Sequence, residues 1–132
     1  MPALLDTAVV IHLRDGDDWT RAQARELDPP LYLSAISRIE LENSVWRDPA
    51  QSPARRAALD ALLPLFEVLD FDAATIASYC AILDHAGFSK RKIADRITAA
   101  TALVHGLPLV TLNGRDFRDV ARLELVEWVR GG

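Results

Sequence analysis

Short apolar runs alternate with amphipathic segments along the whole chain, and this alternation constrains the fold most. The apolar runs that we predict to be strands cover 3–5, 31–33, 66–69, 109–112 and 123–126. Spacing and composition between them predict helices over 7–13, 19–27, 35–46, 53–63, 73–85 and 93–105. Strands that alternate with helices favour a mostly parallel sheet flanked by helices. We therefore expect an α/β fold.

Length and composition predict one soluble domain over residues 1–132. The chain has 132 residues, of which 50% are hydrophobic, enough for one core and too few for two ordinary ones. No basic segment followed by a long apolar stretch comes after Met1, so we expect an unexported, cytoplasmic protein. The single cysteine, Cys80, fits a reducing compartment and cannot supply a multi-thiolate site. Any metal should therefore have oxygen ligands.

The net charge of −4 argues against a general nucleic-acid-binding protein, which would be basic. Basic residues nevertheless gather in two stretches around acidic ones: Lys90, Arg91, Lys92, Arg96, Arg115 and Arg118. They could form a basic rim around an acidic pocket, or they could be ordinary solvated helix ends and loops.

Two aspartates stand close after the ends of predicted strands. Asp6 comes after 3–5, and the segment Asn113-Gly114-Arg115-Asp116 comes after 109–112. Ligands of parallel α/β sheets bind beyond the carboxyl ends of the strands, so we expect both acids at that edge. Each also has a purely structural explanation, because Asp6 can cap the next helix and Asn113-Gly114 can form a turn.

The helix predicted over 93–105 presents a third acid. One apolar stripe at helical spacing should face the sheet: Ile93, Ile97, Ala100 and Val104. Asp95 lies on the opposite side with Ala99 and Ala102, where little bulk would hinder the approach of a substrate. The alternative is that Asp95 only complements the helix dipole.

The helix predicted over 35–46 contains two glutamates in different settings. Glu42 stands four residues after Arg38, which is the spacing of an ordinary surface ion pair. Glu40 has no cationic partner on its own helix, and the residues that share its face are Ile36, Ser37, Asn43 and Ser44. Glu40 is therefore the better ligand candidate of the two.

Four segments in order resemble the motifs of the PIN-domain family, and in particular the VapC-type toxins of type II toxin–antitoxin systems. Leu4–Thr7 is similar to the opening LLDTN, and Ser34–Leu41 to the helix of the second acid. Ala94–Ala102 resembles DxxIAATA, and Thr111–Phe117 resembles TxNxxDF. The resemblance spans residues 3–128 and implies a three-layer PIN-like fold with a short, mostly parallel central sheet.

The resemblance also implies an activity, a metal and partners. It assigns the roles of catalytic residue and metal ligand to Asp6, Glu40, Asp95 and Asp116, with Thr7 and Asn113 supporting these acids. Crowded carboxylates recruit a hard cation, Mg²⁺ or Mn²⁺, which can activate water for hydrolysis of RNA phosphodiester bonds. The implied partners are the RNA, a VapB-like antitoxin and a second copy of the chain. By position alone, the candidate RNA contacts are Lys90, Arg91 and Arg115.

The chain departs from the family pattern at two positions, where Ala8 replaces an asparagine and Thr98 an isoleucine. Neither departure removes a carboxylate. A haloacid-dehalogenase-type phosphatase would need an aspartate at position 8, and a receiver domain would have only Asp72 as a weak phosphoacceptor candidate. A non-toxin PIN-fold nuclease, or a catalytically silent binding module with the same fold, stays open.

Overall fold

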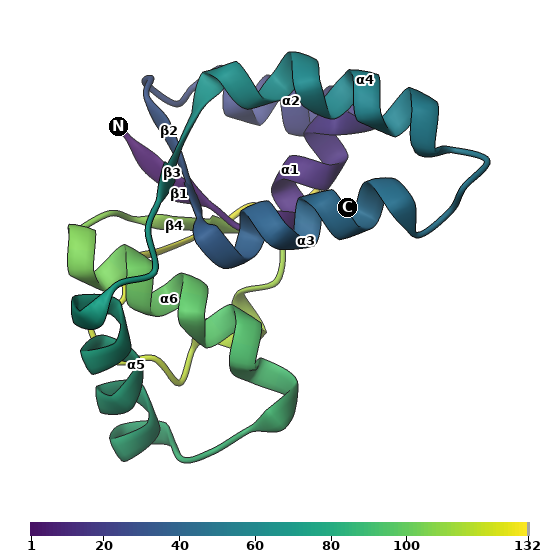
Figure 1. Ribbon diagram of the computed structural model, residues 1–132. Coiled ribbons are helices and arrows are strands. Elements are labelled where there is room, and N and C mark those ends of the chain that lie inside the picture. Colours follow the sequence, from purple (N-terminus) through teal and green to yellow (C-terminus); the bar gives the residue numbers. More distant parts are fainter. Residues whose placement is uncertain (132) are drawn as a thin grey trace.

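The computed structural model describes residues 1–131, which form a three-layer α/β fold around one parallel sheet (Figure 1). The strand order is β3-β2-β1-β4-β5. The strands are β1 (Ala3–Leu5), β2 (Leu31–Ser34), β3 (Phe66–Leu69), β4 (Leu109–Thr111) and β5 (Leu125–Glu127). The helices are α1 (Thr7–Arg14), α2 (Asp18–Ala24), α3 (Ala35–Trp46), α4 (Ser52–Leu62), α5 (Ala73–Ala86) and α6 (Ile93–His105). Short 3₁₀ turns are η1 (Leu63–Leu65), η2 (Lys90–Lys92) and η3 (Gly114–Phe117).

The predicted fold class is confirmed, and every neighbouring pair of strands is parallel. Most boundaries agree with the prediction to within one residue, and two differ by more. Helix α2 ends at Ala24 and not at Leu27, and β5 begins at Leu125 and not at Leu123. Among the described residues, no helix is long and apolar enough to cross a membrane.

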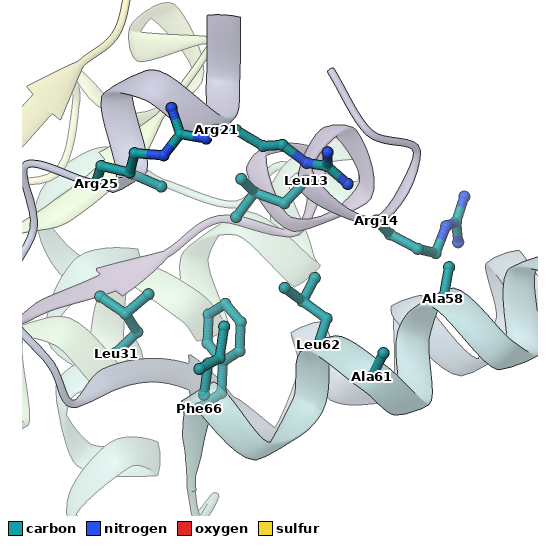
Figure 2. A pocket seen from close by; sticks show the side chains of 11 residues that line it. Leu13, Arg14, Arg21, Arg25, Leu31, Ala58, Ala61, Leu62 and Phe66 are labelled. Atoms are coloured by element: carbon teal, nitrogen blue, oxygen red, sulfur yellow. The ribbon is translucent and has the colours of Figure 1, made fainter. Parts of the chain in front are cut away.

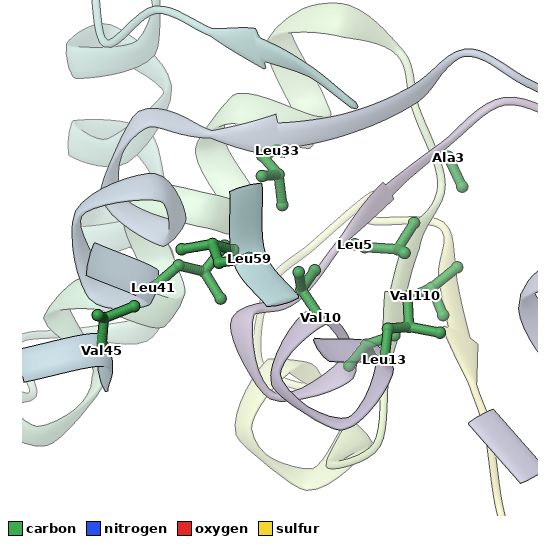
Figure 3. Close-up of a cluster of buried hydrophobic side chains, with 10 residues drawn as sticks. Ala3, Leu5, Val10, Leu13, Leu33, Leu41, Val45, Leu59 and Val110 are labelled. Atoms are coloured by element: carbon green, nitrogen blue, oxygen red, sulfur yellow. The ribbon is translucent and has the colours of Figure 1, made fainter. Parts of the chain in front are cut away.

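The side chains of the three central strands, β2, β1 and β4, alternate between two hydrophobic cores on opposite faces of the sheet. On β1, Leu5 joins the core with α1, α3 and α4, whereas Leu4 joins the core with α5 and α6. On β4, Val110 lies in the first of these cores and Leu109 in the second. Figure 3 shows the first of these cores, where strand and helix side chains meet. Burial on both faces explains why the strands read as continuous apolar runs.

The predicted orientation of α6 is wrong in part, because Ala100 of the expected stripe is fully buried whereas the residues at its two ends are not. Ile93 and Val104 are 39% and 37% exposed, whereas Ala99 and Ala102 are fully buried in the core that contains β1 and β4. The small alanines let α6 approach the sheet closely, and the bulkier residues of the expected stripe lie at the margins. Asp95 is on this alanine face, and it therefore points toward the sheet and not away from it.

Candidate active site

Asp6 lies where β1 passes into α1, at the carboxyl edge of the sheet. Its carboxylate accepts hydrogen bonds from the Thr7 backbone N–H and from the Thr111 hydroxyl, each at 2.9 Å. Burial raises the pKa of the Asp6 carboxyl above its ordinary value, although these two hydrogen bonds oppose the shift. The nearby charges of Glu40 and Asp116 raise this pKa further.

Glu40 reaches the same edge from α3. The Thr7 hydroxyl lies 2.7 Å from Glu40 Oε1 and 2.9 Å from the Ser37 hydroxyl. Thr7 therefore links the start of α1, where Asp6 stands, to the face of α3 that carries Glu40. Glu42 pairs instead with Arg38 at 3.2 Å, as its spacing predicted.

Asp95 shows most directly that the acids share one pocket. Burial, followed by the charges of Asp6, Asp116 and Glu40, raises the pKa of Asp95 to about 6, and Arg91 acts in the opposite direction. Burial is the largest cause of this shift, and the additional effect of Asp6, Asp116 and Glu40 means that their charges lie within Coulombic range of Asp95. The fold thus brings together four acids that are far apart in sequence.

The Asp116 carboxylate is bound by two neighbouring side chains. Its two carboxylate oxygens accept hydrogen bonds from Asn113 Nδ2 at 2.6 Å and from Arg91 Nη1 at 3.1 Å. The Arg91 side chain is 72% exposed, so the ion pair is open to solvent. Arg91 is a cation of this chain that sits at the rim of the acidic pocket.

The turn that carries Asp116 is held by β5. Glu127 accepts a hydrogen bond from the Gly114 backbone N–H at 2.9 Å and pairs with Arg118 at 3.1 Å. The hydrogen bond from Gly114 is the main reason why the pKa of Glu127 is lowered. A Cβ atom on Gly114 would lie 2.6 Å from Glu127 Oε1, so any other residue here would force the Glu127 carboxylate to move.

The four acids fit a hard divalent cation in donor type and in charge, because all offer carboxylate oxygens. As the side chains stand, no three His, Cys, Asp or Glu residues within 1–131 are arranged to hold a metal ion. Glu40 is turned toward Thr7, and Asp116 toward Asn113 and Arg91. The pocket therefore has the chemistry of a metal site, while the carboxylates of Asp6, Glu40 and Asp116 are engaged with protein donors.

The remaining predicted residues divide into two groups. Thr7 and Asn113 contact the acids, and Lys90, Arg91 and Arg115 are exposed on η2 and η3. The rest of the expected basic rim is tied up in ion pairs: Lys92 and Arg96 with Asp119, and Arg118 with Glu127.

Sequence reasoning missed two groups of supporting residues. Thr111 was quoted only as part of a motif, although its place at the end of β4 puts its hydroxyl beside Asp6. A buried hydroxyl network behind Glu40 was also missed, in which Ser34 contacts Ser37 at 3.1 Å and Thr98 at 2.9 Å. Thr98 thus forms a polar contact with the α3 side of the site where the family pattern has an apolar residue.

Comparisons with known proteins identify the family and the fold. The family model described as PIN domain matches residues 3–123. A relative named Ribonuclease VapC1, from Rickettsia felis, is 29% identical over 96% of both chains. VapBC2 from Rickettsia felis bound to a promoter DNA fragment has a TM-score of 0.86 at 23% identity, covering 98% of this chain and 100% of that one. A toxin–antitoxin complex from Klebsiella pneumoniae has a TM-score of 0.74 at 24% identity, covering 94% and 95%. The chain belongs to the PIN domain family.

Proposed function

We propose that this chain is a Mg²⁺- or Mn²⁺-dependent endoribonuclease and the toxin of a toxin–antitoxin pair. The observation that carries the proposal is the placement of Asp6, Glu40 and Asp116 at one edge of the sheet, where Thr7 contacts both Asp6 and Glu40. The charges of these three acids add to burial in raising the pKa of the nearby Asp95. The relative named as a ribonuclease supports RNA as the substrate. Placement of the acids at the carboxyl edge of the sheet supports a ligand site there.

In this mechanism the four carboxylates would hold the cation. When bound, the metal lowers the pKa of a water molecule and offsets charge on the scissile phosphate. Thr111 and the Thr7 backbone fix the Asp6 carboxylate, and the Thr7 hydroxyl does the same for Glu40. Water acts as the nucleophile. The histidines are exposed on helices, at positions 12, 85 and 105. Among the described residues, no hydrogen bond joins a histidine to any of the four acids.

The RNA backbone would lie along the rim formed by η2 and η3. Lys90, Arg91 and Arg115 are exposed there, and Arg91 already contacts Asp116. Phosphates attract Lys and Arg independently of base sequence. Because the net charge of the chain is −4, this local patch must provide the attraction that the molecule as a whole lacks.

The antitoxin would bind at a groove beyond the other end of α1. A cavity of about 540 Å³ lies between α1, α2 and α4, beside the first residues of β2 and β3, and Figure 2 shows its lining. Leu31, Leu62 and Phe66 give it an apolar floor, and the exposed Arg21 and Arg25 line one side. Arg14 also lines the cavity, but its side chain is buried and pairs with Asp15. This combination fits an amphipathic protein segment with apolar anchors and acidic flanks.

Other apolar residues of α1 and α3 do not line this groove. Val9, Val10 and Val45 are fully buried in the core, whereas Ile39 and Trp46 are exposed on α3. Helix α1 separates the groove from Asp6, and its 8 residues make it about 12 Å long. A segment seated there needs only a few extended residues to reach the acids and block them.

The experiment is RNA cleavage by the purified chain with Mg²⁺, with Mn²⁺ and with EDTA. Cleavage should require the cation and should fall at least 100-fold in Asp6→Asn, which keeps the shape and the helix cap. Induced expression of the wild-type chain should arrest growth, and co-expression with the neighbouring small gene should restore it. Cation-independent cleavage, or full cleavage by Asp6→Asn, would contradict the proposed mechanism.

A further inference from the structure

Arg96 is the largest fully buried side chain of the fold, at 2% exposure, and it stands next to Asp95 on α6. The proposed mechanism assigns no role to Arg96, because its guanidinium does not reach the four acids. An arginine cannot lose its charge inside a protein, so its burial needs a compensating anion. The side chain therefore calls for its own explanation.

One carboxylate outside the acidic pocket provides that compensation. Asp119 Oδ2 accepts hydrogen bonds from Arg96 Nη2 at 2.9 Å and from Lys92 Nζ at 3.1 Å. Arg96 Nη1 also donates to the backbone carbonyl of Gly87. We call this cluster of Lys92, Arg96 and Asp119 the Asp119 clamp. It joins three segments: the turn after α5, the start of α6 with η2, and the segment that follows η3.

The Asp119 clamp connects the two elements that carry Asp95 and Asp116. Asp95 immediately precedes Arg96, and Asp116 stands three residues before Asp119. Arg91, which contacts Asp116, is next to Lys92 in the same cluster. A change in the clamp would therefore alter the separation of these two acids, although no clamp side chain contacts either of them.

Stability alone is a poor explanation for the clamp. Arg96 Nε and Asp119 Oδ1 are buried and have no hydrogen-bond partner among the described residues. Buried polar atoms without partners cost free energy, and apolar residues of similar volume often replace a buried ion pair without loss of stability. The ion pair instead fixes the orientation of α6 relative to η3, because Arg96 and Asp119 meet in only one arrangement of these two elements.

We propose that Asp119 and Arg96 are positioning residues that set the distance between Asp95 and Asp116, so that cation affinity depends on Asp119 although it is no ligand. This inference rests on the proposed function. Residues that orient metal ligands typically change metal affinity about 10- to 100-fold when they are replaced.

The test compares Mn²⁺ affinity, measured by titration calorimetry, with thermal unfolding of the same variants in EDTA. Asp119→Asn removes the anion and leaves Arg96 buried without compensation. The double variant Arg96→Met with Asp119→Asn removes both charges, and it should therefore fold well. Asp60→Asn, which breaks the remote Arg56–Asp60 pair on α4, is the matched control.

We expect the Mn²⁺ dissociation constant to rise about 10- to 100-fold in Asp119→Asn. In the double variant the melting temperature should recover toward the wild-type value while the dissociation constant stays raised. Recovery of both quantities in the double variant, or unchanged affinity in Asp119→Asn, would overturn the positioning role. A wild-type chain that binds no Mn²⁺ would overturn the proposed function itself, and this inference with it.

Discussion

Replacing Asp95 by asparagine should stabilise the metal-free protein, and the effect can be worked from the structure. The pKa of Asp95 is about 6 against an ordinary 3.8, a difference of about 2 units. One unit corresponds to about 1.4 kcal/mol, so the ionised group could cost up to about 3 kcal/mol. Asp95 is only half-buried, and solvent screening and the lost helix-dipole interaction reduce this figure. We expect a net gain of about 1–2 kcal/mol at pH 7.5.

The sign depends on pH in a defined way. Above pH 6 the carboxyl is ionised in both states, and only the folded state is destabilised by the charge. Between pH 6 and about 4 the folded protein takes up the proton first, so the advantage of Asp95→Asn shrinks, and below about 4 it vanishes. Wild-type stability correspondingly gains from this group as pH falls through 6.

The assay is thermal and urea unfolding in EDTA at pH 7.5, 5 and 4. Each kcal/mol should move the melting temperature by about 3–5 °C in a domain of this size. Asp84→Asn, an exposed aspartate on α5, should stay within about 0.5 kcal/mol of wild type at every pH. If Asp95 serves only the helix dipole, Asp95→Asn should instead lose about 0.3–1 kcal/mol, and that result would refute the reasoning.

Three further predictions follow from contacts around the site. Gly114→Ala forces the Glu127 carboxylate away, and it should lower both RNA cleavage and stability, the latter by about 1–3 kcal/mol in urea unfolding. Thr7→Val removes the hydroxyl that holds Glu40, and it should reduce cleavage about 10-fold, whereas Thr7→Ser should retain it. Arg21→Glu, at the rim of the antitoxin groove, should weaken antitoxin binding in a pull-down and leave cleavage by the free chain unchanged, so a loss of cleavage or an undiminished complex would count against the groove.

The sequence allowed the strands and helices to be predicted because strands buried on both faces read as short apolar runs. Because ligands of parallel sheets bind beyond the carboxyl ends of the strands, the positions of Asp6 and Asp116 after predicted strands also predicted that both lie at that edge. Asp95 and Glu40 depended on the resemblance to a family, since neither residue has a local pattern that separates a ligand from a surface acid.

The orientation of α6 could not be predicted from its apolar spacing. The spacing emphasises bulky residues such as Ile93 and Val104, whereas close packing on the sheet selected the small Ala99 and Ala102. Arg96 likewise looked like part of a basic rim, because its anion, Asp119, is 23 residues away in sequence. Contacts of this kind arise from the tertiary arrangement and leave no local signal.

The central claim, that the four carboxylates act together with a divalent cation on RNA, is tested most directly by one pair of variants on α3. Glu40→Gln and Glu42→Gln make the same chemical change two residues apart, but only Glu40 faces the pocket, while Glu42 pairs with Arg38 and Arg56. The measurement is the rate of Mn²⁺-dependent RNA cleavage for the two variants beside wild type. We predict a loss of at least 100-fold for Glu40→Gln and a rate within about 2-fold of wild type for Glu42→Gln. Equal rates for the two variants would contradict the account.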